Sequence, residues 1–339
     1  MIAEFAISPS VFEEAAHPDK DEWIDQLREL GNHMLPKTAA SAVMIADLCD
    51  GSWFHEIERA VKAIENPRVG RLCRDLLPQI KQLLVKRPTE GHNWPHQSLE
   101  WCRQALATHR VLEVERIISC RGIQDQLQPE GHSVRCLSEV STTQFWHGIS
   151  AQWAQDLTID SQVAAIRKIS QHAQFLMFIN PYQNGESGGE TDFTLEAIRR
   201  ALNRPRGYNP VAIEIHTKGP ESDGTGFEKS LENLVGNLRQ RIEEILPNGI
   251  QVRLVHWREF LDRHLIAGDF TYSSSGVQRQ RPRWGVHLGH VARKGDNDKD
   301  RPPTTWSLLM PSDLGKIHAR FSAFSDHQVL SNITVVGKQ

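Results

Sequence analysis

The sequence predicts an α/β protein in which a mainly helical N-terminal region precedes a β–α–β–α–β domain. Residues 19–110 repeat apolar side chains at helical spacing, for example at Trp23, Leu27, Leu30 and Met34. From residue 174 the period changes, and short apolar runs alternate with amphipathic helical stretches. Parallel strands joined by right-handed helical crossovers produce this alternation. We therefore expect two domains, residues 1–165 and 166–339.

The N-terminal region is predicted to hold several helices and few strands. Helical periodicity covers residues 19–35, 41–49, 53–65, 71–87 and 98–110. Residues 2–9 alternate weakly, and residues 114–120 are rich in branched side chains, so each is a candidate strand.

The C-terminal region is predicted to place its strands side by side. Candidate strands cover residues 174–182, 209–216 and 250–257, with helices at 193–202 and 227–246, and a fourth strand lies within 258–270. Ligands of such folds bind at the carboxyl ends of the parallel strands. Asn180, His216 with Lys218, and His256 are therefore expected at that edge.

Composition narrows the function only slightly. The formal net charge of −3 over 339 residues gives no whole-protein argument for nucleic-acid binding, so any basic patch must be local. The five cysteines form no C-x-x-C pair, which favours reduced thiols over a disulfide framework or a zinc site. We expect a cytoplasmic protein without a signal peptide or membrane span, and predict no metal or cofactor.

His216, Lys218 and Asp223 form the spacing H-x-K-x-x-x-x-D. In phosphodiester chemistry a histidine attacks phosphorus and a lysine stabilises the charge on the non-bridging oxygens. Strand alternation would put His216 and Lys218 on one face. The alternative is that a strand ends at His216 and a polar loop follows, and the spacing alone does not decide between them.

A strand ending in "INPY", the strands "IEIH" and "VRLVHW", and then "FLDRHLIAGDF" follow one another in the last 165 or so residues. In this order they resemble one half-domain of the phospholipase D-like superfamily, in the bacterial branch with an H-D-R-x-L-I motif strand. The resemblance implies a mixed sheet, metal-independent phosphodiesterase chemistry and dimerisation of two halves. It places the motif at Leu261-Asp262-Arg263, with Arg263 holding phosphate and Leu261 at the nucleophile position.

A leucine cannot form a phosphohistidine, which leaves three interpretations. His264 could replace the nucleophile, although neighbouring strand residues face opposite sides and this would need a bulge. His216 could reach in from a neighbouring strand end and act with Arg263. Alternatively, the site is inactive and the domain serves as a binding scaffold.

Arg279, Arg281, Arg283 and Trp284 form a basic, aromatic segment after the motif strand. Arginines hold phosphates and tryptophan stacks on bases, so the segment is a candidate nucleic-acid-binding site. The alternative is a solvated loop whose charge is offset by Asp296, Asp298 and Asp300.

Two main classes of function follow, and a third option, a doubly wound nucleotide-binding domain, is disfavoured because no G-x-G-x-x-G loop follows the first strand. The first is a metal-independent phosphodiesterase or nuclease. The second is a catalytically inactive scaffold or partner-binding subunit that uses the degenerate fold. In both cases nucleic acid is the expected partner, and prokaryotic antiviral defence and mobile-element systems often contain such chains. The helical N-terminal half would then dock a second copy or another protein.

Overall fold

The computed structural model describes residues 2–34, 40–48, 51–87, 94–95, 97–109, 114–130, 134–156, 158–203, 212–220, 226–291, 303–322 and 329–338. The chain forms two compact units, an N-terminal unit that runs to Ala151 and a C-terminal unit that begins at Gln152. None of the helices in the described ranges is long and apolar enough to cross a membrane.

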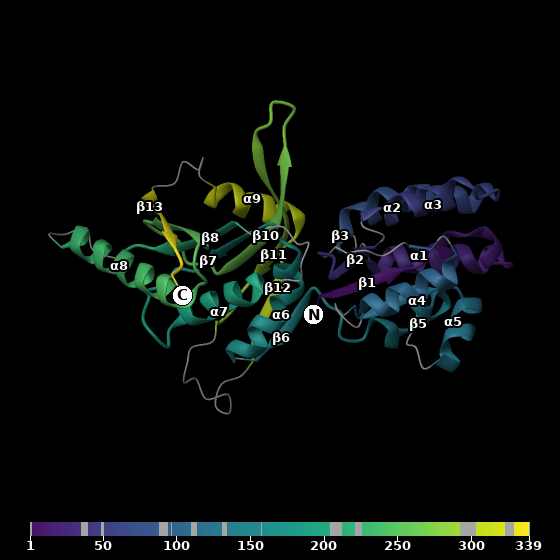
Figure 1. The fold of residues 1–339 in the computed structure, drawn as a ribbon, viewed down its shortest axis with the longest axis horizontal. Helices are drawn as coiled ribbons and strands as arrows, with labels where there is room; N and C mark the ends of the chain where they lie inside the picture. The colour runs from purple at the N-terminus through teal and green to yellow at the C-terminus, as the bar shows by residue number, and fades with distance from the viewer. Residues whose placement is uncertain are drawn as a thin grey trace. The chain divides into compact units, whose positions relative to one another are not determined.

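The N-terminal unit is built on a five-stranded parallel sheet in the order β3-β2-β1-β4-β5. Its strands are β1 (Ala3–Ile7), β2 (Val43–Asp47), β3 (Leu84–Lys86), β4 (Arg116–Ser119) and β5 (Val134–Cys136). Its helices are α1 (Lys20–Met34), α2 (Trp53–Lys62), α3 (Pro67–Leu83), α4 (Ser98–His109) and α5 (Arg121–Leu127). Figure 1 shows these helices around the sheet.

The N-terminal unit is therefore α/β, and the prediction of a mainly helical region was too coarse. The strands expected at residues 2–9 and 114–120 are present as β1 and β4. Residues 41–49, predicted to be helical, instead contain β2. All five residues of β2 are buried, and a strand buried on both faces is a continuous apolar run that periodicity cannot distinguish from a buried helix.

The carboxyl ends of β1 and β4 lie side by side at the point where the strand order reverses. Beyond β1, a 3-10 turn over Pro9–Phe12 carries buried serines. The Ser10 hydroxyl is 3.0 Å from the hydroxyls of both Ser8 and Ser119, and it accepts the Cys120 backbone N–H at 3.2 Å. This edge is thus occupied by polar groups that satisfy one another. Four buried cysteines of this unit are free thiols: Cys73, Cys102, Cys120 and Cys136.

The C-terminal unit holds an eight-stranded mixed sheet in the order β13-β9-β8-β7-β10-β11-β12-β6. Its strands are β6 (Gln152–Gln155), β7 (Phe175–Ile179), β8 (Ala212–Lys218), β9 (Gln251–Trp257), β10 (His264–Tyr272), β11 (Gln278–His287), β12 (Thr304–Leu308) and β13 (Val329–Val336). Its helices are α6 (Ile159–His172), α7 (Glu190–Leu202), α8 (Phe227–Ile245) and α9 (Pro311–Phe321).

The predicted β–α–β–α–β order of this unit is confirmed. Strands β7, β8 and β9 are parallel, and β10, the expected fourth strand, pairs antiparallel with β7. The crossovers through α7 and α8 step in one direction along the sheet, which puts both helices on one face. Helix α9 covers the other face, where Leu314 and Phe321 pack against an apolar cluster that includes Phe175, Met177 and Trp257.

The register aligns one row of residues across the carboxyl ends of the parallel strands. His287 pairs with His264, His264 with Ile179, Ile179 with His216, and His216 with Val255. Strands lie about 4.8 Å apart, so the backbones of His216 and His264 are roughly 10 Å apart with Ile179 between them.

Strands β10 and β11 continue past the opposite edge of the sheet as a two-stranded arm. The last residue of β10 that pairs with β7 is Gly268, opposite Phe175 at the start of β7. From there the hairpin runs on to a turn closed by the Ser273 N–H bond to the Val277 carbonyl. Figure 1 shows the arm extending away from the sheet. Arg279–Trp284 are thus part of a strand, not of a loop.

Candidate functional site

His216 lies near the carboxyl end of β8 and is buried beneath α9. The Trp257 indole N–H donates a hydrogen bond of 2.9 Å to His216 Nδ1. Because an indole can only donate, Nδ1 carries a lone pair and the hydrogen sits on Nε2. Nε2 then donates to Glu214 Oε2 at 3.0 Å. Both ring nitrogens are occupied, and burial lowers the pKa of His216, which Glu214 only partly offsets.

Glu214 connects His216 to groups on the neighbouring elements. Its other carboxylate oxygen accepts from Gln280 Nε2 at 3.0 Å, and the Arg253 guanidinium lies 3.6 Å away. Gln280 Oε1 in turn lies 3.0 Å from His318 Nε2 on α9. Burial opposes ionisation of Glu214, but the His216 bond and the Arg253 charge outweigh it and lower the pKa of this carboxyl. The result is a polar chain from β9 to α9 in which Glu214 and His216 are buried and the outer members are half-buried.

Arg263 precedes β10 and makes a bidentate ion pair with Glu190, the first residue of α7. Arg263 Nε lies 2.9 Å from Glu190 Oε2, and Nη2 lies 3.0 Å from Oε1. The Asn180 amide also donates to Glu190 Oε2 at 2.9 Å. The guanidinium stacks on the Tyr182 ring, 4.3 Å from its centroid. The arginine expected to hold phosphate therefore already holds a buried carboxylate.

The other two proposed nucleophile positions are no better arranged. Leu261 is 74% exposed and carries no catalytic group. His264 is buried beside His287 and faces the opposite side of the sheet from Arg263, as alternation requires. Burial, aided by His287, lowers the pKa of His264 to about 4. Asp223, the last residue of the H-x-K-x-x-x-x-D spacing, lies outside the described residues.

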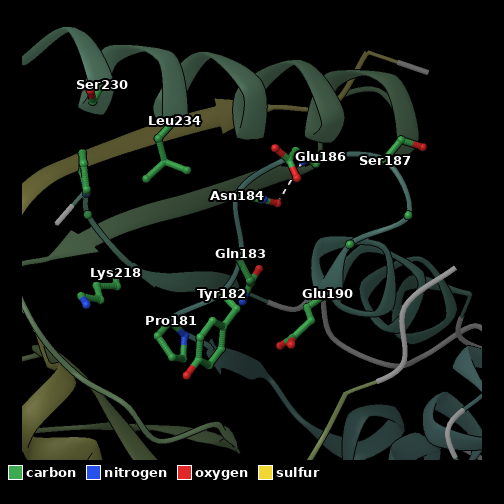
Figure 2. Close-up of a pocket in the computed structure, with 14 residues that line it drawn as sticks. Pro181, Tyr182, Gln183, Asn184, Glu186, Ser187, Glu190, Lys218, Ser230 and Leu234 are labelled. Atoms are coloured by element: carbon green, nitrogen blue, oxygen red, sulfur yellow. Dashed lines mark hydrogen bonds between the residues drawn. The ribbon is translucent and has the colours of Figure 1, made fainter. Parts of the chain in front are cut away.

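Lys218 ends β8 two residues after His216, and its side chain lines a pocket rather than the histidine cluster. The pocket measures about 580 Å³ and lies at the carboxyl ends of β7 and β8. Figure 2 shows α8 along one side with Ser230 and Leu234, and the loop after β7 with Tyr182 and Gln183. Among the described residues no group of three or more His, Cys, Asp or Glu is arranged to hold a metal ion.

Arg279 and Arg281 lie on the arm, beyond the sheet edge opposite to Arg263, whereas Trp284 pairs with Ala267 inside the sheet. Asp269 pairs with Arg281 at 2.6 Å through Nε and lies 3.6 Å from Arg283. Arg283 also stacks over Trp284, 4.5 Å from the ring. Arg279 is exposed and pairs with no acidic group in the described part of the chain. The structure therefore places Arg263 apart from the arginines of the arm. His216 is linked to the arm through Glu214 and Gln280.

Comparison with known proteins adds little to this picture. No family model matches the sequence, and no curated protein matches it. The crystal structure of polyphosphate kinase from Porphyromonas gingivalis aligns with 66% of this chain and 40% of its own, at 11% identity and a TM-score of 0.29. The chain thus spans less than half the length of that enzyme, and a likeness this slight carries no argument about function.

Sequence reasoning missed Glu190, Gln183 and Glu214. Glu190 stands in a polar stretch, "GESGGETD", that contains three glycines and gives no sign of a partner 73 residues later. Gln183 follows the buried strand β7 in a turn, where a polar residue is ordinary. Only Glu214 offered a signal, since a carboxylate within the apolar strand "AIEIH" requires a buried partner.

Proposed function

We propose that the chain is a nucleic-acid-binding protein built on a phospholipase D-like domain that has lost its phosphodiesterase chemistry. We attribute the loss of phosphodiesterase chemistry first to His216, because Trp257 and Glu214 occupy both of its ring nitrogens. Leu261 supplies no nucleophile, and His264 faces away from Arg263. This supports the inactive scaffold over the metal-independent nuclease.

The arm formed by β10 and β11 supports nucleic-acid binding. Between residues 264 and 291 the chain has three arginines and one acid, Asp269, so the formal charge of this segment is 3 − 1 = +2. Arg279 and Arg281 are exposed, and Tyr272 near the tip is 69% exposed. A two-stranded ribbon fits the major groove of a duplex, with arginines on phosphates and an aromatic ring on a base.

The test is binding and cleavage of labelled single- and double-stranded DNA and RNA by the full chain, with chelator present. We expect binding without cleavage. The double variant Arg279→Ala/Arg281→Ala should weaken binding at least about tenfold and reduce the slope of log affinity against log salt by about 1 to 2. The matched control is Arg199→Ala/Arg239→Ala, which removes two exposed arginines from α7 and α8.

Two results would contradict the proposal. Cleavage that survives chelator and disappears in His216→Ala would restore the phosphodiesterase. Binding that the arm variant leaves unchanged, or that both double variants weaken equally, would remove the arm as the binding element.

A further inference from the structure

The pocket at the carboxyl ends of β7 and β8 contains a polar side chain that the fold leaves unsatisfied. Gln183 is 1% exposed, and neither its Oε1 nor its Nε2 has a hydrogen-bond partner among the residues that the structure describes. Its position is fixed, because its backbone carbonyl accepts the Thr217 hydroxyl at 2.9 Å. An unpaired buried amide destabilises a fold, so its presence on the pocket wall indicates a ligand that completes it.

Gln162 shows what a structural buried glutamine does in the same unit. It is fully buried in α6, and its Nε2 donates to the His290 carbonyl at 3.1 Å. Gln162 thus joins a helix to the end of β11 and the residues that follow. Gln183 makes no such side-chain connection, which sets it apart.

The groups around Gln183 limit the ligand class. A glutamine amide presents a donor beside an acceptor, which matches the N6 and N7 edge of adenine. The Tyr182 ring next to it is 47% exposed, and aromatic rings stack on bases. Lys218 lines the same pocket and suits a phosphate, while the exposed Glu186 carboxylate suits ribose hydroxyls. The pocket volume of about 580 Å³ lies within the usual range for small-molecule sites.

We propose that this pocket binds an adenine nucleotide, with Gln183 on the base edge, Tyr182 against the base and Lys218 at the phosphate (Figure 2). The site lies at the opposite sheet edge from the arm and is a separate function from the one proposed above. A free nucleotide and the terminal adenylate of a nucleic acid present the same chemistry, and the experiment separates them.

The test is calorimetric titration of the full chain with AMP, adenosine, GMP and inorganic phosphate. We expect AMP to bind more tightly than GMP, because guanine offers only acceptors at N7 and O6 and leaves the glutamine oxygen unpaired. Gln183→Met should weaken AMP binding at least tenfold, and Lys218→Ala should weaken AMP but not adenosine. The matched control, Gln162→Met, should leave the AMP affinity unchanged.

Two further measurements distinguish a free nucleotide from the terminal adenylate of a nucleic acid. They are AMP binding by the arm variant Arg279→Ala/Arg281→Ala, and binding of an oligonucleotide that ends in adenylate. Binding of AMP that is unchanged in the arm variant indicates a free nucleotide. If only the oligonucleotide binds, and Gln183→Met weakens it, the ligand is a strand end. Thermal unfolding shows whether each variant folds. If Gln183→Met does not fold, Tyr182→Ala provides a second test of the pocket.

Three results would overturn the proposal. These are no binding of AMP or of the oligonucleotide at millimolar concentration, equal binding of inorganic phosphate and AMP, or an affinity for AMP that Gln183→Met and Tyr182→Ala both leave unchanged.

Discussion

The two units of this chain differ in how the polar side chains at equivalent sheet edges are hydrogen-bonded. In both, parallel strands end side by side at an edge where α/β folds bind ligands. In the N-terminal unit, Ser8, Ser10 and Ser119 fill that edge and bond one another. In the C-terminal unit the edge holds a pocket and an amide, Gln183, that has no partner in the described part of the chain. A shared architecture therefore supplies the position of a site, and the residues after each strand decide whether one exists.

One buried ion pair in each unit shows a similar difference, in its exposure and in its distance from a pocket. Glu4 and Arg87 pair inside the N-terminal unit, where both side chains are fully buried. Glu190 and Arg263 pair at the border of the pocket, where Arg263 remains 14% exposed. We infer that the first pair fixes a core and the second fixes a site wall.

The largest predicted effect comes from breaking the fully buried pair. Arg87→Met removes the guanidinium that neutralises Glu4 and should destabilise the N-terminal unit by about 3–5 kcal/mol. The measurement is urea unfolding followed by thiol labelling, which reports on this unit because every cysteine lies before residue 140. Arg28→Met, which breaks an exposed pair with Asp25, should cost less than about 1 kcal/mol. Equal costs for the two variants would show that burial does not set the difference.

One buried group in each unit, Asp47 and His264, is predicted to change the stability of its unit in opposite directions in acid. Burial raises the pKa of Asp47, at the end of β2, from 3.8 to about 6. The folded N-terminal unit therefore binds a proton more readily than the unfolded chain. The resulting stability is present below about pH 4 and is lost as the pH rises through 6. The change corresponds to about 3 kcal/mol for a shift of this size.

His264 gives the C-terminal unit the reverse dependence. Its pKa falls from 6.5 to about 4, so the unfolded chain binds the proton more readily. Stability is present above pH 6.5 and is lost as the pH falls through 4, again by about 3 kcal/mol. Pulse proteolysis in urea at pH 4.5 and 7, with fragments assigned by mass, should show that acid favours the N-terminal unit more in the wild-type chain than in Asp47→Asn, while the C-terminal unit loses stability. The same acid response of the N-terminal unit in the wild-type chain and in Asp47→Asn would contradict the prediction.

The sequence predicted four strands of the C-terminal unit, β7 to β10, because each is a short apolar run bounded by turn residues, but it missed β6, β12 and β13. From strand order alone it also placed Lys218 and His216 at the carboxyl edge. It could not predict their partners, since Trp257 is 41 residues from His216 and its contact depends on strand register. Nor could it predict β2, whose complete burial removes any period, or the arm, whose strands continue beyond the sheet.

The loop that forms the pocket wall is predicted to depend on Gly185. This residue has φ +77°, and an added Cβ would lie 2.6 Å from backbone atoms of Asn237 and Leu238 in α8. Gly185→Ala should therefore destabilise the C-terminal unit by about 2–3 kcal/mol, through left-handed strain and displacement of the loop. Gly249→Ala, with φ +85° and open space around the Cβ, isolates the strain and should cost about 1 kcal/mol. Urea unfolding of both variants measures the difference, and equal costs would mean that the loop is not held against α8.

The smallest predicted effects are changes of opposite sign in the stability of the two units, and they test the contrast between the two edges directly. Ser10→Ala removes a hydroxyl that bonds Ser8, Ser119 and the Cys120 N–H, so it should destabilise the N-terminal unit by about 1–2 kcal/mol. Gln183→Met replaces an unpaired amide by an apolar group of similar volume, so without ligand it should stabilise the C-terminal unit by up to about 1 kcal/mol. Thermal unfolding of each variant gives both values. A loss of stability in Gln183→Met would show that the Gln183 amide stabilises the fold. The two edges would then differ in shape, and neither would hold a polar side chain kept for a ligand.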